Sequence, residues 1–265
     1  MDINFLKQNG VDTDKALELF GDMDIYNETF QDYLDGIDEK LKNLERSKNN
    51  ENWADYGIFA HSIKSDARYL GFTKEAEIFL AHEMAGKEAN QHFIEKEYDN
   101  LLKTVAYMTS IVKRYLNGEK ALTRLPEKEN SQPVTINNEP KEEIVLIADD
   151  SKIVDNFALK VMEGKYKGVV AIDGKEAIDI ISSNKYNILA ILLDLNMPNV
   201  GGFEVLEYLK NSNHYSNIPI SIITGEDSKD MIDKAFQYNI VDMLVKPFSK
   251  NDFLRVLDKT INLKK

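Results

Sequence analysis

Five short apolar runs, separated by stretches with helical periodicity, fill the second half of this 265-residue chain and restrict its possible folds. Short runs rich in Val, Ile and Leu are typical of strands buried on both faces of a parallel sheet. The alternation predicts an α/β domain over residues 142–265 with a doubly wound, five-stranded parallel sheet. The predicted strands are 144–148, 169–172, 189–193, 218–223 and 241–245. The predicted helices lie near 152–163, 174–184, 202–211, 227–237 and 249–262.

Polar residues follow four of these strands, at the point where each strand ends. They are Asp149, Asp150, Asp194, Thr224 and Lys246. Because parallel strands end at the same edge of a sheet, we expect these side chains to gather at the ligand crevice. Three close carboxylates repel one another and need a cation, and a set of hard oxygen ligands suits Mg²⁺. The backbone carbonyl of Asn196 is a further candidate ligand.

This set of residues suits phosphoryl transfer. With a cation bound, one carboxylate can act as the nucleophile on a phosphoryl group. The phosphoryl oxygens would then be shared among the cation, Lys246 and the Thr224 hydroxyl. Asp194 is the predicted nucleophile because it stands alone at the central strand, whereas the paired acids suit metal binding. Taken singly, each residue is also explained as a helix cap, a turn residue or a surface lysine; the convergence of the whole set favours a site.

The first half of the chain has a different pattern. Residues 5–116 contain no proline and show repeated apolar spacings of three and four, which are typical of amphipathic helices. The clearest stripes are Ile37, Leu41 and Leu44, and later Leu101, Val105, Met108, Ile111 and Val112. Helices without strands predict an all-α, four-helix-type bundle over residues 1–117.

One predicted helix of this bundle, near residues 53–70, carries a histidine away from its apolar stripe. At about 100° per residue, His61 falls opposite the stripe, and we expect it in solvent beside Lys64, Ser65 and Arg68. The two cations would stabilise a phosphoryl group on the imidazole. The alternative is an ordinary surface histidine. The other histidines, His82, His92 and His214, are expected to be surface residues.

Residues 118–141 hold three of the six prolines and almost no periodicity, so they are predicted to form a flexible linker. A coil of ~20 residues spans ~25 Å, which lets the two halves meet or work apart. The linker does not decide between these alternatives.

Composition excludes several classes of protein. A net charge of −12 argues against nucleic acid or an anionic membrane as the main partner. The chain has no cysteine, which excludes disulfides and thiolate metal sites and makes a reducing cytoplasm the expected location. No apolar run approaches the ~20 residues of a membrane span. We find no glycine-rich phosphate loop, so we do not expect the chain to be a kinase that uses ATP.

The segment HSIKSDARYLGF at residues 61–72 resembles the motif of histidine-phosphotransfer (HPt) domains, and the resemblance extends over residues 5–118. It implies that His61 accepts a phosphoryl group and that Lys64 assists electrostatically. Ser65 stands where the family usually has glycine. The sequence offers no account of Asp66.

Residues 143–262 resemble the response-regulator receiver domain, which has a flavodoxin-like fold. The resemblance rests on Asp149-Asp150, Asp194 with Met197-Pro198, Thr224, and Lys246-Pro247-Phe248. It implies that Asp194 accepts a phosphoryl group, with Mg²⁺ at the acidic residues. Met243 stands where receivers usually carry the tyrosine or phenylalanine that reports phosphorylation.

Together the two resemblances predict a two-component phosphorelay protein. Phosphoryl would pass between His61 and Asp194, or between these residues and external partners such as a sensor histidine kinase or other receivers. The chain would be a phosphotransfer intermediate, with the direction of transfer open. The alternative is a non-catalytic adaptor that docks partners, with His61 as the site expected to be inactive. An enzyme that hydrolyses phosphoryl groups on another receiver has no motif here.

Overall fold

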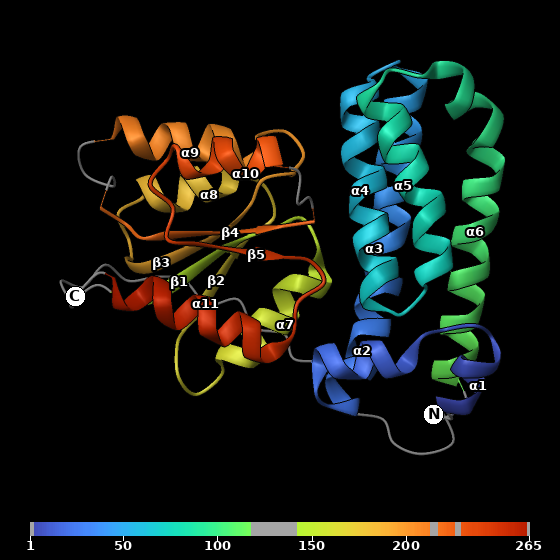
Figure 1. Cartoon of the computed structure of the whole chain (residues 1–265), viewed down its shortest axis with the longest axis horizontal. Helices are drawn as coiled ribbons and strands as arrows, with labels where there is room; N and C mark the ends of the chain where they lie inside the picture. The colour runs from blue at the N-terminus through green and yellow to red at the C-terminus, as the bar shows by residue number, and fades with distance from the viewer. Residues whose placement is uncertain (1–2, 118–141, 213–216, 226–228, 264–265) are drawn as a thin grey trace, which may run out of the picture.

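The computed structural model describes residues 3–117, 142–212, 217–225 and 229–263. These residues form a helical bundle and an α/β domain that lie side by side (Figure 1). The predicted linker at 118–141 and His214 lie outside the described residues. None of the helices in the described segments combines the length and hydropathy that crossing a membrane requires.

The first half is helical, as predicted. Four long helices run up and down beside one another, and two short helices lie across one end (Figure 1). The Asp22 side chain caps the first long helix by accepting from the backbone N–H of Asp24 at 2.6 Å. The helices are α1 (Ile3–Gln8), α2 (Thr13–Phe20), α3 (Met23–Asn49), α4 (Trp53–Tyr69), α5 (Thr73–Lys87) and α6 (Gln91–Asn117).

A pair of glycines sets the close packing of α4 against α5. A Cβ atom added to Gly86 would lie 2.6 Å from the backbone of Gly57, closer than real atoms approach. The two backbones therefore meet only because neither residue has a side chain. This approach brings the buried face of α5 directly against α4.

The second half is the predicted doubly wound sheet. All pairings between neighbouring strands are parallel, and the strand order is β2-β1-β3-β4-β5. The strands are β1 (Glu143–Ala148), β2 (Gly168–Ala171), β3 (Asn187–Asp194), β4 (Ile220–Thr224) and β5 (Asp242–Val245). The helices are α7 (Lys152–Met162), α8 (Gly174–Ser182), α9 (Gly202–Asn211), α10 (Lys229–Phe236) and α11 (Lys250–Asn262).

The alternation of side chains along β1 divides the hydrophobic core between the two faces of the sheet. Ile144 and Leu146 belong to the cluster under α8, α9 and α10, whereas Val145 and Ile147 belong to the cluster on the α7 and α11 side (Figure 1). Burial on both faces explains why the strands read as continuous apolar runs.

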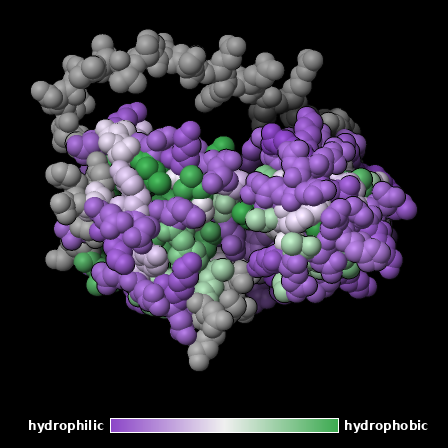
Figure 2. Space-filling view, turned by 90° about the horizontal axis from the view of Figure 1, so that it is seen from above, coloured by the Kyte–Doolittle hydropathy of each residue, from purple (hydrophilic) through white to green (hydrophobic). Residues whose placement is uncertain are grey.

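The core on the α7 and α11 side continues into the bundle. Phe20 of α2 packs edge-on against Phe157 of α7, with ring centroids 5.6 Å apart. Tyr69 of α4 packs in the same way against Phe248, at 5.9 Å. The sequence left open whether the halves meet, and in this structure they share one hydrophobic cluster. Away from the contact, the bundle presents a mostly hydrophilic surface in the view of Figure 2.

The prediction that His82 lies on the surface is wrong. Its side chain is fully buried on α5, and its Nδ1 lies 2.8 Å from the hydroxyl of Tyr56. The imidazole also packs edge-on against Phe93, at 5.3 Å between ring centroids. α5 packs against both α4 and α6, so it has little free surface. His92 is exposed, as predicted.

Burial lowers the pKa of His82 to about 4, from an ordinary value of 6.5. An unfolded chain therefore takes up a proton near pH 6.5, while the folded chain keeps His82 neutral until about pH 4. The resulting stability is fully present above pH 6.5 and is lost as the pH falls towards 4. Between pH 6.5 and pH 4 the free energy of unfolding of the parent should fall by about 3 kcal/mol through this group. His82→Gln should not show that fall.

Urea unfolding at several pH values between 4 and 7 measures this effect. The exposed-histidine variant His92→Gln is the matched control and should keep the pH dependence of the parent. An unchanged pH dependence in His82→Gln would contradict the assignment.

Candidate functional site

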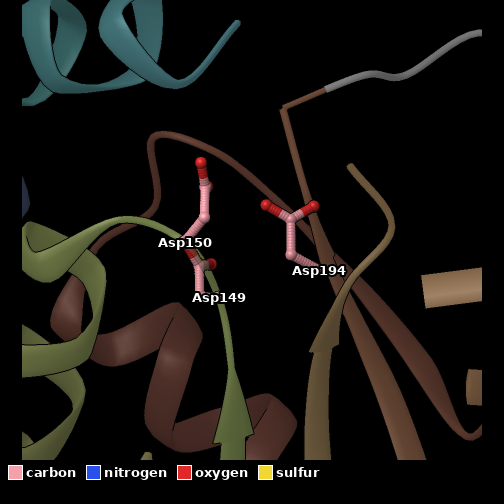
Figure 3. A group of neighbouring side chains, drawn as sticks. All are labelled: Asp149, Asp150 and Asp194. Atoms are coloured by element: carbon pink, nitrogen blue, oxygen red, sulfur yellow. The ribbon is translucent and has the colours of Figure 1, made fainter. Parts of the chain in front are cut away.

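Three carboxylates meet at the carboxyl edge of the sheet (Figure 3). Asp149 and Asp150 follow β1 and Asp194 ends β3; these strands are neighbours. One oxygen from each carboxylate lies within 4.8 Å of those of the other two. Asp149 and Asp194 are fully buried. The sheet therefore brings together the three acids that the sequence predicted at this edge.

Backbone amides orient two of these carboxylates. Asp149 Oδ1 accepts from the N–H of Ser151, and Asp194 Oδ1 accepts from the N–H of Asn196, both at 3.0 Å. Each carboxylate is thus tied by one oxygen to the turn after its own strand. The second oxygen of each, Oδ2, is left for the group at the centre of the site.

That central group is the ammonium of Lys246. Its Nζ lies 2.6 Å from Asp194 Oδ2 and 2.7 Å from Asp149 Oδ2. Burial alone would lower the pKa of Lys246, but the charges of Asp149 and Asp194 hold the pKa well above its ordinary value. Burial raises the pKa of Asp149 to about 7, against the opposing charge of Lys246. Three carboxyl groups thus surround one ammonium, and burial disfavours the charged form of Asp149.

Two further features complete this edge. Thr224 ends β4 and is fully buried, one residue beyond Ile223, which pairs with Asp194. A Cβ on Gly202 would lie 2.2 Å from the backbone oxygen of Asp194, so only glycine lets the start of α9 approach the loop that follows the strand. The predicted residues Thr224 and Lys246 thus lie at the same edge as the acids.

The donor set fits a hard divalent cation. Three carboxylates face one ammonium, and their oxygens are close enough for one ion to contact all three. Oxygen ligands and excess negative charge are what Mg²⁺ prefers. The role of the Asn196 backbone carbonyl as a ligand stays a prediction.

The prediction that His61 lies in solvent is wrong. His61 lies on α4, as expected, but only 2% of it is exposed. The face opposite the bundle core is covered by α5 on one side and by the α/β domain on the other. A Cβ added to Gly225, directly after β4, would lie 2.7 Å from His61 Nε2. The imidazole therefore points its Nε2 at the carboxyl edge of the sheet.

Glu83 of α5 is the site residue that the sequence did not reveal. Its Oε1 lies 3.0 Å from His61 Nδ1, and its Oε2 accepts from Lys64 Nζ at 2.5 Å. Lys87 Nζ lies 2.9 Å from Oε1. No spacing within α4 indicates this partner, because it comes from the next helix across the Gly57–Gly86 contact.

The network fixes the chemistry of the imidazole. Burial alone would raise the pKa of Glu83, but the hydrogen bond and charge of His61, together with Lys64, hold the pKa well below its ordinary value. Two groups lie near Nδ1, and the carboxylate is the nearer, at 3.0 Å against 3.2 Å for Lys64 Nζ. A carboxylate only accepts hydrogen bonds, so it favours the form of His61 with a proton on Nδ1. In the neutral ring, Nε2 then carries the free electron pair that faces the α/β domain.

Of the two basic residues predicted beside His61, Lys64 lies next to it and Arg68 contacts another residue. Lys64 is buried, and burial lowers its pKa while the charge of Glu83 opposes that change. Its Nζ lies 3.2 Å from His61 Nδ1. Arg68 is partly exposed and lies 3.7 Å from Glu77 instead.

Asp66, for which the sequence offered no account, joins the two halves of the chain. Its carboxylate is buried and accepts from Lys40 Nζ at 2.6 Å and from the Ser151 hydroxyl at 3.0 Å. Ser151 directly follows the paired acids of the site. Asp66 thus hydrogen-bonds across the contact beside the acidic cluster.

Comparisons with known proteins identify the second half of the chain. The family model of the response regulator receiver domain matches residues 145–258. The chain is 31% identical over 146 residues to the CAI-1 autoinducer sensor kinase/phosphatase CqsS of Vibrio cholerae, covering 54% of this chain and 20% of that protein. It is 28% identical over 124 residues to the two-component response regulator ORR3 of Oryza sativa, covering 46% of this chain and 94% of that protein.

Solved receiver structures are also similar. Chemotaxis protein CheY4 of Vibrio cholerae is 26% identical, with 46% of this chain and 99% of that chain covered and a TM-score of 0.41. The Mn²⁺-bound form of response regulator Rcp1 is 25% identical, with 45% and 91% covered and a TM-score of 0.40.

Residues 145–258 are therefore a response regulator receiver domain of two-component signalling, as the sequence predicted. This chain spans 20% of the length of the CqsS protein and 10% of that of hybrid signal transduction histidine kinase D of Dictyostelium discoideum, which it matches at 28% identity over 60% of its own length.

The buried network of Glu83 leads to a stability prediction. Replacing Glu83 by alanine leaves Lys64 buried without its anionic partner, and breaking a buried pair in this way costs about 3 kcal/mol. We expect Glu83→Ala to lower the free energy of unfolding by that amount in urea. The control is Glu77→Ala, whose partner Arg68 is partly exposed, with an expected change below about 0.5 kcal/mol. Equal effects of the two variants would contradict the buried network.

Proposed function

We propose that the chain is a phosphorelay protein in which phosphoryl passes between His61 Nε2 and the carboxylate of Asp194. The observation that carries this proposal is the position of His61. It is buried at the carboxyl edge of the receiver sheet, with Nε2 facing the residue that follows Thr224. The same edge carries the acidic cluster and Lys246. On this reading the helical half acts as an HPt domain.

The transfer step balances with the protonation that Glu83 favours. A phosphorylated Nε2 with a proton on Nδ1 is an imidazolium. When an oxygen of Asp194 attacks the phosphorus, the P–O bond forms and the P–N bond breaks. The electron pair returns to Nε2, and His61 leaves as the neutral ring with its Nδ1 proton still held by Glu83. The reverse step creates the imidazolium, which the Glu83 carboxylate stabilises.

The receiver residues have separate roles in this proposal. Lys246 neutralises charge on the transferred phosphoryl, and the Thr224 hydroxyl donates to one of its oxygens. Asp149 and Asp150, with Asp194, would hold Mg²⁺, and the ion when bound would neutralise phosphoryl oxygens. Partners of the chain would be a sensor histidine kinase or other receivers. A cytoplasmic location stays a prediction of the sequence.

An adaptor is the second candidate. It is favoured by one observation: His61 and Asp194 are both buried where the two halves meet, at 2% and 0% exposure. A chain locked in this form would dock partners without exchanging phosphoryl with them.

Acetyl phosphate with Mg²⁺, followed by intact mass, separates the two candidates. We expect a phosphoryl adduct that is absent in Asp194→Ala. An aspartyl phosphate is lost in base and a phosphohistidine in acid. A part of the adduct should therefore be lost in acid, and His61→Gln should abolish that part alone. An adduct that is wholly base-labile would refute transfer to His61, and the absence of any adduct would favour the adaptor.

The cation site gives a separate prediction. Mg²⁺ binding only to the folded chain raises its melting temperature. We expect such a rise in the parent and its loss in Asp150→Asn, together with about a hundredfold slower phosphorylation by acetyl phosphate. Asp179→Asn, at an exposed position of α8, is the control and should behave as the parent. An equal Mg²⁺ response in Asp150→Asn would refute a site at these acids.

A further inference from the structure

The contact between the bundle and the receiver has a general part and a fitted part. The aromatic pairs Phe20–Phe157 and Tyr69–Phe248 bury apolar surface, which favours association with little selectivity. The fitted part lies beside the acidic cluster. It includes the approach of His61 to Gly225 and the hydrogen bond between Asp66 and Ser151.

The approach at Gly225 leaves no room for any side chain. An added Cβ would lie 2.7 Å from His61 Nε2, 2.8 Å from His61 Cε1 and 3.6 Å from the Ser65 hydroxyl. Gly225 is not among the residues with positive φ, so its own backbone would accept alanine. The three atoms nearest to the added Cβ all belong to the facing bundle. Ser65 of the bundle stands where HPt domains usually have glycine. The residue of the receiver that faces it is the glycine Gly225.

The Asp66–Ser151 hydrogen bond also depends on both surfaces, because one partner lies on each. Asp66 and Ser151 are 2% and 0% exposed, so neither can turn to water while the surfaces are together. A receiver without a hydroxyl at this position would leave one oxygen of Asp66 buried without that partner. A bundle without the carboxylate would leave the Ser151 hydroxyl in the same state.

The docked surfaces cover both groups of the proposed transfer. His61 is 2% exposed, Asp194 0% and Lys246 4%. A histidine of another protein reaches Asp194 only when the chain's own bundle has moved away. Docking therefore decides which donor the receiver accepts.

We propose that Gly225 and the Asp66–Ser151 hydrogen bond are specificity-determining contacts. They fit this receiver to the bundle of its own chain, and they exclude histidines of other proteins while the two are docked. The docking part of this proposal rests on the contacts alone. The exclusion of other histidines rests on the proposed transfer between His61 and Asp194. The two parts are tested separately.

The first experiment measures docking without phosphoryl chemistry. The chain has no cysteine, so Lys103→Cys on α6 and Asp179→Cys on α8 give two unique, exposed positions for spin labels. Double electron–electron resonance should give one narrow distance in the parent. Gly225→Val should broaden it to longer distances. Ser151→Ala should lower the ratio of docked to separated chains about tenfold, through loss of one buried hydrogen bond.

Gly36→Ala is the matched control for the change at Gly225. Gly36 lies on α3 at the same contact, but an added Cβ would meet only the Cδ atom of Lys152, at 3.8 Å. This variant should keep the narrow distance of the parent. Narrow distances in Gly225→Val and Ser151→Ala as well would overturn the proposal, whatever the phosphoryl experiments show.

The second experiment measures exclusion with two copies of the chain. The donor copy carries Asp194→Ala and is phosphorylated on His61 with phosphoramidate. The acceptor copy carries His61→Gln and accepts only on Asp194. Adding Asp66→Ala to the acceptor loosens its own bundle and leaves its receiver unchanged, so transfer between copies should rise about tenfold. Adding Ser151→Ala instead should leave the rate almost unchanged, because it weakens docking of both bundles equally.

An equal effect of Asp66→Ala and Ser151→Ala would overturn exclusion by the chain's own bundle. If the acetyl phosphate experiment shows no transfer to His61 while the distance measurements respond as expected, the proposed function fails and the docking contacts stand. The two failures are therefore distinguishable.

Discussion

The buried negative charge around Lys246 is the constraint on which the rest of the structure depends. Asp149 and Asp194 have no exposure to water, and the one ammonium between them cannot neutralise both together with Asp150. A group of like charges in such a place is unfavourable unless its oxygens are held and opposed. The fold meets this requirement with parallel strands that end at one edge, and with backbone N–H groups that hold one oxygen of each buried acid. The remaining oxygens form a site with unused capacity for positive charge.

The bundle contains a second buried polar network, in which the balance of charged groups is reversed. There a single carboxylate, Glu83, contacts His61, Lys64 and Lys87. The receiver edge has excess anions around one cation, and the bundle has excess nitrogen around one anion. The two networks face one another where His61 lies against Gly225. The two carboxylates hold the pKa of Lys246 well above its ordinary value, so it stays an ammonium.

The sequence predicted those features of the site that depend on local pattern and strand connectivity. It missed those that depend on residues far away along the chain. The receiver edge could be predicted because the connectivity of parallel strands alone places Asp149, Asp194 and Lys246 together. The position of His61 on α4 followed from helical spacing. Its burial did not, because the covering groups come from α5 and from a loop more than a hundred residues further along the chain.

The same reason accounts for Glu83, Asp66 and His82. Glu83 meets His61 only through the close approach of Gly57 and Gly86, which no pattern within one helix reveals. Asp66 finds Ser151 across 85 residues of sequence. His82 is buried because α5 has helices on both sides. Local periodicity predicts which face of a helix is apolar, but not which polar face a second domain covers.

In the proposed relay, the balance of charge at the contact would also link docking to phosphorylation of His61. A phosphoryl group adds roughly −1.5 to −2 charges at neutral pH. On His61 this charge would face the acidic cluster, where Lys246 is already shared between two carboxylates. Docking of the phosphorylated bundle is then opposed by like charge unless a cation occupies the acidic residues, since like charges at close range disfavour one another. The aromatic contacts carry no charge, so this repulsion does not act on them directly. In the proposed relay the acidic cluster would therefore act on two equilibria, because the oxygens that would bind a cation would also oppose the return of a phosphorylated His61 to its place beside Gly225.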